Sequence, residues 1–477
     1  MEFDLSKKHC YFFNEICKIP HGSHNEKGIS DYLVSFAKER NLKCVQDKVY
    51  NVVIYKDASK GYENSAPIIL QGHMDMVCEV NRGTEFDFEK DSLSLRVEDG
   101  WLMATDTTLG ADDGVAVAYM LAVLDDETIA HPALECCFTV SEETGLQGAL
   151  NFDKNNITAK RMVCLDSSGE IVTTVSCAGG TRAITSLKGT LIDNDKNTYS
   201  LFVSGLKGGH SAKFINSGRT NSIITANRIV KEATKKGIDI SLVSIEGGLK
   251  ENAIPRECEC IFASTSDFEE IKKAFKESFD NIAYEYAVGE PDMKYELKEV
   301  AKADKVFDET STAKVLNLIY LIPNGFKERS LEIEGLTLTS LNLGVIRTIN
   351  DTVRLTDCIR SAIDSSKMNL VNEIKALAEC LGAEVELQAP YPGWNYLKDC
   401  PLRDVLGKAI KDNTGRDMLI EATHGGNECG VFSSFGVKEI VAYGPIMEDI
   451  HTPKEKLSLK SFDTCYKVLV QVLKDAK

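Results

Sequence analysis

The first third of the chain alternates short apolar runs with amphipathic stretches. Ser23 and Glu26 have the spacing of a capping box, and the apolar positions that follow, up to Phe36, have helical periodicity, so a helix is predicted to end near Arg40. Four apolar runs bounded by turn residues predict strands at residues 49–55, 67–70, 136–140 and 162–165. A helical pattern at residues 114–124 lies between two of these strands. Strands that alternate with helices predict an α/β layer with a largely parallel sheet.

A different pattern begins at about Thr181. Segments that read as strands, several of them alternating polar and apolar residues, follow at residues 199–203, 241–245, 258–263, 336–343 and 353–359. Helical patterns separate them at residues 221–233, 267–279 and 367–380. This order predicts an α+β domain in which helices cover an antiparallel sheet.

A weak internal repeat lies within this second region. Three residues recur with one offset of 98 positions (350 − 252): Asn252, Arg256 and Cys260 recur as Asn350, Arg354 and Cys358. A helical pattern follows each triplet, which predicts duplicated β-β-α halves. Because three identities are few, a chance match is the alternative.

The α/β pattern returns after Pro392 and Gly393. A helix, a strand and a final helix are predicted at residues 402–411, 438–443 and 462–473. The predicted fold class is therefore α/β, with a mixed, largely parallel sheet flanked by helices. Residues 1–180 and 389–477 form this first domain, and an inserted α+β domain at residues 181–388 interrupts it.

Composition and charge exclude several classes of protein. The chain has 477 residues, of which 43% are hydrophobic and 27% are charged, enough for several domains with cores of their own. Its 55 basic and 72 acidic side chains give a formal net charge of −17. Such a surface repels phosphate groups, so neither nucleic acid nor an anionic membrane is expected as a partner. No apolar run approaches the roughly 20 residues that span a bilayer.

The cysteines and the N-terminus predict a cytoplasmic protein. The first residues lack the apolar stretch of a signal peptide. The fifteen cysteines are scattered and odd in number, as expected of reduced thiols. No pair has C-x-x-C spacing, so the closely spaced cysteines are interpreted as small buried hydrophobic residues rather than nucleophiles or zinc ligands.

The residues that suggest chemistry follow the predicted strands. Imidazoles and carboxylates come directly after an apolar strand or at a helix start, at His73, Asp75, Asp112, Asp113, Glu142, Glu143, Asp166 and His451. In open α/β sheets the strand ends converge on one crevice. Each motif alone has an ordinary structural explanation, such as a turn, a cap or a helix-starting acidic pair. Together they predict a cluster of negative groups.

Clustered carboxylates repel one another and lose hydration in a crevice, and divalent cations relieve both costs. Two imidazoles and three carboxylates, one of them bridging, form a nitrogen and oxygen set that suits zinc. Two such ions held close together can share a water, lower its pKa and polarise a carbonyl. The sequence therefore predicts a dinuclear metal site.

Four motifs carry a resemblance to a known family. They are Gln-Gly-His-Met-Asp-Met-Val at residues 71–77, Thr-Leu-Gly-Ala-Asp-Asp-Gly at 108–114, Ser-Glu-Glu-Thr-Gly at 141–145, and Gly-Pro followed by His-Thr-Pro within 444–453. This set resembles the co-catalytic di-zinc metallopeptidases that include carnosinase and aminoacylase, and within them the aminoacyl-histidine dipeptidase (peptidase D) branch. The likeness runs nearly end to end and includes the inserted domain, which is a lid in that family.

The resemblance implies a role for each residue of the cluster. Asp112 would bridge two zinc ions, and the complete ligand set would be His73, Asp112, Glu143, Asp166 and His451. Asp75 would orient the imidazole of His73. Glu142 would be the general base, which takes a proton from the metal-bridging water and passes it to the leaving amine. The resemblance also implies a cis peptide bond between Asp112 and Asp113.

The lid is expected to supply the substrate contacts. His210 resembles a lid histidine that stabilises the developing oxyanion, and its structural alternative is a residue that closes a glycine turn. Asn252 and Arg360 match positions that engage the backbone and the carboxylate of the substrate. For Arg360, a surface position on a strand is the alternative. Gly425 and Glu428 belong to a loop expected beside the substrate, although such glycines more often only make a turn.

The expected protein is a cytoplasmic di-zinc dipeptidase that acts on unblocked dipeptides, with X-His dipeptides as the preference of the branch. Manganese or cobalt could substitute for zinc. A small peptide is the expected partner, and a homodimer is open because relatives often form one. The alternatives are a related amide hydrolase (an N-acyl amino acid deacylase or a carboxypeptidase) and, less favoured because Glu142 and the ligand set are all present, a non-enzymatic metal-binding protein.

Overall fold

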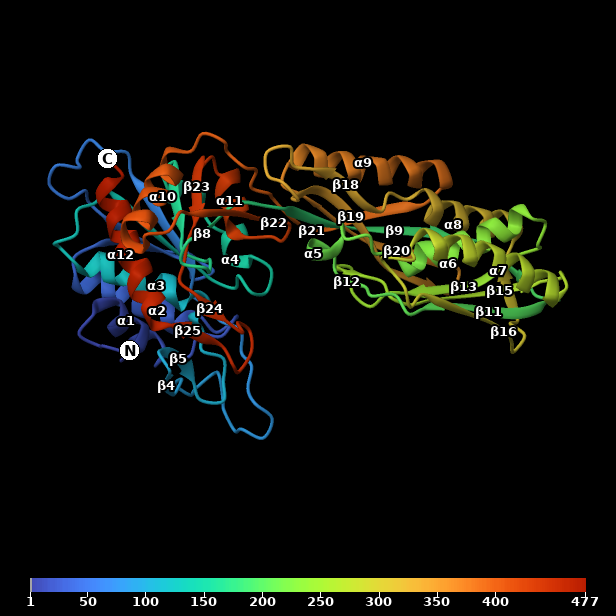
Figure 1. Ribbon diagram of the computed structural model, residues 1–477, viewed down its shortest axis with the longest axis horizontal. Coiled ribbons are helices and arrows are strands. Elements are labelled where there is room, and N and C mark those ends of the chain that lie inside the picture. The colour runs from blue at the N-terminus through green and yellow to red at the C-terminus, as the bar shows by residue number, and fades with distance from the viewer. Residues whose placement is uncertain (1) are drawn as a thin grey trace. The chain divides into compact units, whose positions relative to one another are not determined.

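The chain enters one compact unit, leaves it at Cys177 and returns at Trp394. The computed structural model describes residues 2–477 (Figure 1). The first unit consists of the segment that ends at Cys177, together with Trp394–Ala422 and Asn427–Lys477. The second unit is Ala178–Gly393 with the short segment Thr423–Gly426. The predicted division at residues 180 and 388 thus lies within a few residues of the observed one, and the segment 423–426 was not predicted to leave the first domain.

The helices of the first unit are α1 (Lys8–Ile16), α2 (Lys27–Glu39), α3 (Ala111–Asp125), α4 (Gln147–Leu150), α10 (Pro401–Thr414), α11 (Glu428–Ser434) and α12 (Leu459–Asp475). Its main sheet has eight strands in the order β1 (Lys43–Gln46), β2 (Val52–Lys56), β6 (Leu134–Thr139), β3 (Ile68–His73), β7 (Arg161–Cys164), β23 (Glu439–Ala442), β8 (Val172–Cys177) and β22 (Leu419–Thr423). A smaller antiparallel sheet joins β24 (Met447–Glu448), β25 (Lys456–Ser458), β5 (Trp101–Ala104) and β4 (Leu95–Glu98).

The main sheet is mixed, with its parallel strands in the centre. Strands β6, β3, β7 and β23 are mutually parallel, whereas β1, β2 and β8 pair in the antiparallel sense. The α/β class is thereby confirmed. The four central strands are the ones whose carboxyl ends lie side by side, so they are the strands that build a site.

Helix α3 forms the centre of the first core. Its residues from Val115 to Leu124 are all at most 1% exposed, which fits a helix that is apolar on every side. It packs against α1, α12 and β3. Gly72 makes its close approach to β3 possible, because a Cβ at that position would lie 2.2 Å from the Cβ of Ala116 and 2.4 Å from Oδ2 of Asp113.

The helices of the second unit are α5 (Ser211–Phe214), α6 (Ser222–Lys235), α7 (Phe268–Glu285), α8 (Glu309–Leu321) and α9 (Asp364–Leu381). Its main sheet follows the order β16 (Lys294–Val300), β11 (Asn197–Ser204), β15 (Cys258–Ser264), β13 (Ser241–Gly247), β19 (Thr337–Ile349), β20 (Thr352–Ser361), β9 (Gly179–Lys188) and β21 (Glu384–Tyr391), with β18 (Gly325–Arg329) beside β19. Two short pairs complete the unit, β10 (Leu191–Asp193) with β17 (Lys305–Phe307) and β12 (Gly209–His210) with β14 (Ala253–Ile254).

Neighbouring strands of this second sheet pair in the antiparallel sense, as the polar and apolar alternation predicts. Helices α6 to α9 lie along one face of it (Figure 1). The units β13–β15–α7 and β19–β20–α9 have the same order and the same antiparallel pairing. The duplication of a β-β-α half stays a prediction, and the matching topology of these two units agrees with it.

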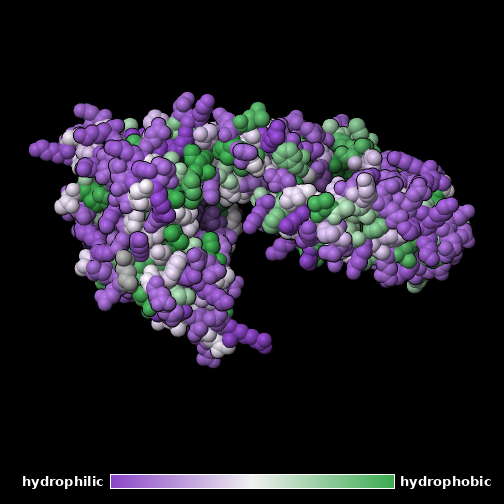
Figure 2. All heavy atoms as spheres, viewed as in Figure 1, coloured by the Kyte–Doolittle hydropathy of each residue, from purple (hydrophilic) through white to green (hydrophobic). Residues whose placement is uncertain are grey.

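Hydrophilic residues cover most of the surface displayed in Figure 2. Among the described residues, no helix combines the length and the apolar character needed to cross a membrane. All fifteen cysteines are free, and Cys136, Cys137, Cys258, Cys260 and Cys429 are buried, as their interpretation as small hydrophobic residues predicts.

Candidate active site

The predicted ligand residues of the first unit lie at the carboxyl ends of the central strands and in two loops. His73 is the last residue of β3, and Asp166 follows β7 by two residues. Glu142 and Glu143 follow β6, Asp112 lies at the start of α3, and His451 lies between β24 and β25. Their ligand atoms form three overlapping groups in which all atoms lie within 4.8 Å of one another: His73 with Asp113 and Asp166, His73 with Glu142 and Glu143, and Asp112 with Glu143 and His451.

The carboxylate of Asp112 lies between the two imidazoles. Its Oδ1 is 3.2 Å from Nε2 of His73, and its Oδ2 is 3.3 Å from Nε2 of His451. The same Nε2 of His451 is 2.7 Å from Oε1 of Glu143. The peptide bond between Asp112 and Asp113 is cis, as the resemblance implied. One carboxylate therefore faces two separate nitrogen ligands, one through each oxygen.

The charge of this cluster is poorly balanced by the protein itself. Burial raises the pKa of Glu142 to about 9, and the nearby carboxylates of Asp166 and Glu428 add to the rise although His73 opposes it. Burial and the neighbouring Asp112 raise the pKa of Asp166 to about 7. Hydrogen bonds to Asp112 and Glu143 raise the pKa of His451 to about 10. Among residues 2–477, no lysine or arginine forms an ion pair with a carboxylate of the three groups.

This donor set fits divalent cations. Imidazole nitrogens and carboxylate oxygens are the ligands that zinc takes in proteins, and manganese and cobalt accept the same set. A cation would also offset the burial and the repulsion between carboxylates that raise the pKa values of Glu142 and Asp166. The residues present therefore fit the predicted metal site, with one addition. Asp113, which was not predicted as a ligand, contributes to one of the three groups.

The carboxylate of Asp75 contacts four groups around the cluster. Its Oδ1 lies 3.3 Å from Nδ1 of His73 and accepts a 3.0 Å hydrogen bond from the backbone N–H of Glu142. Its Oδ2 accepts from the hydroxyl of Ser23 at 2.8 Å and from the N–H of Glu143 at 3.4 Å. Burial opposes the charged form, but His73 and these donors lower the pKa of Asp75. One buried carboxylate thus fixes both a histidine and the Glu142–Glu143 turn.

The second unit holds its own group of predicted residues. His210 ends β12 and is paired in register with Ala253, so Asn252 lies next to it in the adjoining strand turn. The N–H of Ser211 donates a 2.8 Å hydrogen bond to the carbonyl of Asn252. Burial and the charge of Arg360 lower the pKa of His210. His210, Asn252 and Arg360 therefore belong to one region of the second unit.

Arg360 is a buried cation without a carboxylate partner. It is 7% exposed, and its Nη1 donates a 3.1 Å hydrogen bond to the hydroxyl of Tyr391. Its Nε is buried without a hydrogen-bond partner, and no ion pair is formed by Arg360 within the described chain. The alternative stated for Arg360, a surface position on a strand, is wrong because the side chain is buried. An unpaired buried charge is costly unless a ligand completes it.

The loop expected beside the substrate divides between the two units. Gly425 belongs to the second unit, where its carbonyl accepts from the N–H of Ala178 at 3.0 Å and its N–H donates to Oγ1 of Thr423. Glu428 belongs to the first unit and is 0% exposed. The prediction that Glu428 contacts a substrate is therefore wrong for this structure, because its carboxyl group is sealed inside the unit.

Glu428 instead bonds to the two strands that lead to the candidate ligands. Its Oε2 accepts hydrogen bonds from Nε2 of Gln71 at 2.5 Å and from the hydroxyl of Thr139 at 2.6 Å. Thr139 pairs in register with His73 on the adjacent strand. Burial raises the pKa of Glu428 to about 7. The side chain thus ties α11 to the two strands that present His73 and the Glu142–Glu143 turn.

Comparison with known proteins decides the family. The model of peptidase family M20/M25/M40 matches residues 69–475. The chain belongs to this family. Membership makes the protein a hydrolase that acts on peptide bonds, and the resemblance drawn from the sequence motifs is confirmed.

Three known proteins show how far the similarity of this M20 peptidase extends. It is 32% identical over 470 residues to the cytosol non-specific dipeptidase of Escherichia coli (strain K12), covering 97% of this chain and 96% of that one. The crystal structure of aminoacylhistidine dipeptidase from Vibrio alginolyticus matches with a TM-score of 0.93 at 31% identity, over 98% and 96% of the two chains. The aminopeptidase PepT of Bacillus cereus shares the fold, with a TM-score of 0.59 at 17% identity over 100% of each chain.

Glu455 is a residue of the M20 site that the sequence did not reveal. Its Oε2 accepts from the N–H groups of Leu109 at 2.8 Å and Gly110 at 3.1 Å. Its Oε1 accepts from the N–H groups of Ala111 at 2.8 Å and Asp112 at 3.3 Å. The side chain is 2% exposed. Glu455, at the end of the loop that carries His451, thus holds the turn that presents Asp112. In the sequence, the position of Glu455 four residues after His451 is the only signal that could have suggested this contact.

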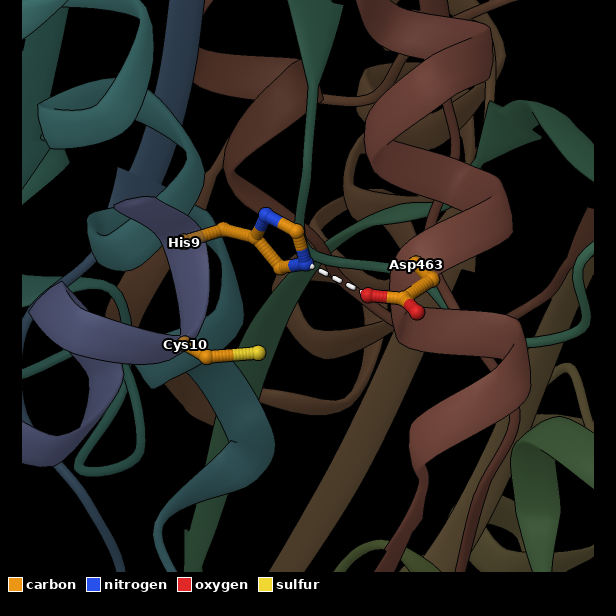
Figure 3. A group of neighbouring side chains, drawn as sticks. All are labelled: His9, Cys10 and Asp463. Carbon is orange, nitrogen blue, oxygen red and sulfur yellow. Dashed lines mark hydrogen bonds and ion pairs between the residues drawn. The ribbon is translucent and has the colours of Figure 1, made fainter. Parts of the chain in front are cut away.

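A second cluster in the M20 peptidase resembles a metal site but has a structural explanation. His9, Cys10 and Asp463 place ligand atoms within 4.8 Å of one another (Figure 3). Oδ1 of Asp463 lies 2.8 Å from Nε2 of His9, while Lys7 forms an ion pair with its Oδ2. Burial raises the pKa of the Cys10 thiol to about 12, which disfavours a thiolate ligand. Lys7 already supplies the positive charge, so this cluster joins α1 to α12 without a metal.

Proposed function

We propose that this M20 peptidase is a cytosolic dipeptidase that depends on two divalent cations and acts on unblocked dipeptides. One observation carries the proposal. The carboxylate of Asp112 faces His73 through one oxygen and His451 through the other, which is the arrangement a bridging ligand needs. The names of the Escherichia coli and Vibrio alginolyticus relatives support dipeptides as the substrate class and the cytosol as the location.

Five residues would hold the cations, with zinc as the expected metal and manganese or cobalt as substitutes. His73 and Asp166 would belong to one ion, Glu143 and His451 to the other, and Asp112 to both. When bound, the ions supply Lewis acidity to the reacting carbonyl and water. Asp75 keeps the imidazole of His73 in the orientation that directs Nε2 at the site.

Glu142 is proposed as the general base. It adjoins the ligand Glu143, and its ligand atom lies within 4.8 Å of those of His73 and Glu143. The backbone N–H of Glu142 is fixed by Asp75, so the turn that carries the carboxylate is held in place. In the reaction its carboxylate receives a proton from the attacking water and returns one to the leaving amine.

The second unit is proposed to supply the substrate contacts. Arg360 is suited to the carboxylate of the peptide, because its guanidinium is buried and lacks an anion in the described chain. Asn252 is proposed to contact the peptide backbone, and His210 to donate a hydrogen bond to the oxyanion. Burial and Arg360 both lower the pKa of His210, which favours its neutral form.

The relatives' names suggest two different specificities. One is described as non-specific and the other as acting on aminoacyl-histidine. A panel of dipeptides that includes β-alanyl-histidine, tested with zinc, manganese and cobalt, separates broad from histidine-directed activity. Higher activity on N-acetyl amino acids or on longer peptides would contradict the dipeptidase proposal and favour a deacylase or a carboxypeptidase.

A Glu142→Gln variant tests the assignment of the base. The amide keeps the shape of the side chain but cannot accept a proton, so kcat is expected to fall by about 100-fold or more. Metal content is expected to stay at the wild-type stoichiometry. Full activity in a variant that holds both ions would refute the role of Glu142. Loss of activity together with the ions would leave the structural role of the turn as its explanation.

A further inference from the structure

Two polar side chains on strand β19 lie on the same sheet face as Arg360. Ser340 is paired in register with Arg360, and Asn342 is paired with Cys358 two positions along. Because directly opposed residues share a face and alternate residues do too, Ser340, Asn342 and Arg360 project to one side of the sheet. Ser340 and Asn342 are each 1% exposed. Each of them contacts a different loop of the second unit.

Ser340 holds the segment 423–426. Its hydroxyl is 2.7 Å from Nε2 of His424, and both residues are buried. Burial and the charge of Arg360 lower the pKa of His424 to about 3, although a hydrogen bond to the backbone of Thr337 opposes the shift. The imidazole is therefore neutral. Ser340 and His424 are therefore hydrogen-bond partners on the sheet face that carries Arg360.

Tyr391 holds the same segment from the other side. A Cβ on Gly426 would lie 2.7 Å from its ring, and a Cβ on Gly180 would lie 2.5 Å from it. Gly180 is the register partner of Arg360 on strand β9. The ring therefore lies close to both glycines, and its hydroxyl accepts from Arg360. Segment 423–426 is thus fixed beside the guanidinium.

Asn342 holds the loop that carries Asn252. Its Nδ2 donates to the carbonyl of Glu251 at 2.8 Å and to the carbonyl of Ala253 at 2.9 Å. These two bonds bracket Asn252. Gly344 permits the close approach, since a Cβ there would lie 2.4 Å from the backbone of Glu251. The same loop then pairs with His210 through Ala253.

We propose that Ser340 and Asn342 are positioning residues for recognition of the substrate's C-terminal carboxylate. Ser340 acts through His424 and the segment 423–426, and Asn342 acts through the loop 251–253. Together they hold two loops on the sheet face that carries Arg360, so that its guanidinium meets a carboxylate in one geometry. This inference rests on the function proposed above, in which Arg360 binds that carboxylate. It adds two residues, neither of which touches the substrate, that determine selectivity for a free C-terminus.

The inference predicts a selective effect on KM. A dipeptide with a free carboxylate uses the guanidinium, whereas the corresponding dipeptide amide does not. Loss of one loop anchor is expected to raise KM about tenfold for the free dipeptide, because a displaced charge-assisted hydrogen bond is worth about that factor. For Ser340→Ala, KM for the amide is expected to change less than about twofold, and kcat for both substrates to change little. For Asn342→Leu, whose loop carries Asn252 and adjoins His210, KM is expected to rise for both substrates, but more for the free dipeptide.

The experiment compares alanyl-alanine with alanyl-alanine amide as substrates of the metal-loaded enzyme. The variants are Ser340→Ala, which removes the hydrogen-bond partner of His424, and Asn342→Leu, which removes both hydrogen bonds of the Asn342 amide at similar volume. Ser340→Thr retains a hydroxyl and is expected to restore the low KM. Ser200→Ala is the matched control, because Ser200 is a buried serine of the same sheet whose hydroxyl bonds only to Glu259, at 2.6 Å. Thermal unfolding of each variant reports its folding.

Three results would overturn the inference. Equal changes of KM for the free dipeptide and the amide would show that the side chains stabilise the unit without selecting a carboxylate. Unchanged KM values in folded Ser340→Ala and Asn342→Leu would show that the loops need no anchor. A wild-type enzyme that hydrolyses neither substrate would refute the proposed function and with it this inference. If Asn342→Leu does not fold, Ser340→Ala and its threonine counterpart still decide the question.

Discussion

Removal of the Glu455 carboxylate should destabilise the turn that presents Asp112 to the proposed metal centre. Four backbone N–H groups of the turn 109–112 donate to this side chain, at 2.8, 3.1, 2.8 and 3.3 Å. Hydrogen bonds to a charged acceptor contribute about 1.5–3 kcal/mol each, but bonds to one carboxylate are not additive. Glu455→Ala leaves the four donors buried without an acceptor, so we expect a loss of about 3–5 kcal/mol in unfolding free energy.

The second effect should appear in metal binding. The turn presents Asp112, which faces both imidazoles, so its displacement weakens both proposed metal sites together. Changes to groups that orient a ligand typically cost about 10–100-fold in metal affinity. Glu455→Gln keeps the shape and one acceptor oxygen, so its losses should lie between those of the wild type and Glu455→Ala.

Urea unfolding of the metal-free protein measures the first effect, and a competition titration with a zinc-binding dye measures the second. Glu448→Gln is the control, because Glu448 is an exposed carboxylate of the neighbouring strand whose contact is an ion pair with Lys456 at 2.7 Å. Its unfolding free energy should change by less than about 1 kcal/mol. The argument for Glu455 fails if Glu455→Ala unfolds at the wild-type urea concentration and binds zinc with wild-type affinity.

Three further changes probe the surroundings of the same centre. Asp75→Asn should lower metal affinity by about 10–100-fold, because an amide nitrogen would face donors that now bind oxygen; equal affinity in the titration would contradict the orienting role. Gly72→Ala should lower the free energy of unfolding in urea by about 3 kcal/mol or more, since its Cβ would overlap Ala116. Gly28→Ala is the control and should be neutral or stabilising, because Gly28 lies in a helix and its Cβ would be 3.4 Å from the nearest side chain. In the metal-free protein, folding raises the pKa of Glu142 to about 9 and that of His451 to about 10. Both groups then hold protons that the unfolded chain releases, so stability should fall as the pH rises from 7 to 9, and a rise in Tm over that range would refute the sign.

The sequence predicted the strands that build the site because their apolar runs are short, continuous and followed by polar residues. Strand β3 and its terminal His73 are an example, since residues 68–70 are all buried. Helix α1 was not predicted, because its nine residues are too few for a clear periodicity. Helix α8 was also missed, although Asp308 caps it through its side chain.

The candidate metal ligands could be proposed from the sequence because His73, Glu143 and Asp166 follow strand ends and Asp112 begins a helix, where local sequence motifs mark their positions. Glu455 and Glu428 were not predictable in the same way. Each carboxylate acts on residues that are hundreds of positions distant in the chain, such as Asp112 for Glu455 and Gln71 for Glu428. A glutamate that serves as a buried acceptor has the same local sequence as a glutamate on a surface, so only the tertiary fold distinguishes them.

Asp75 and Glu455 also explain how one site can hold several carboxylates close together in the metal-free protein. Asp75 and Glu455 both accept hydrogen bonds from main-chain N–H groups, and those donors lie in the turns that carry Glu142, Glu143 and Asp112. Backbone donors cannot be lost by titration or by substitution of a neighbouring side chain. The ligand turns are therefore held by anions that do not compete for the metal, and the proposed ligand carboxylates are left to carry the charge that the cations neutralise.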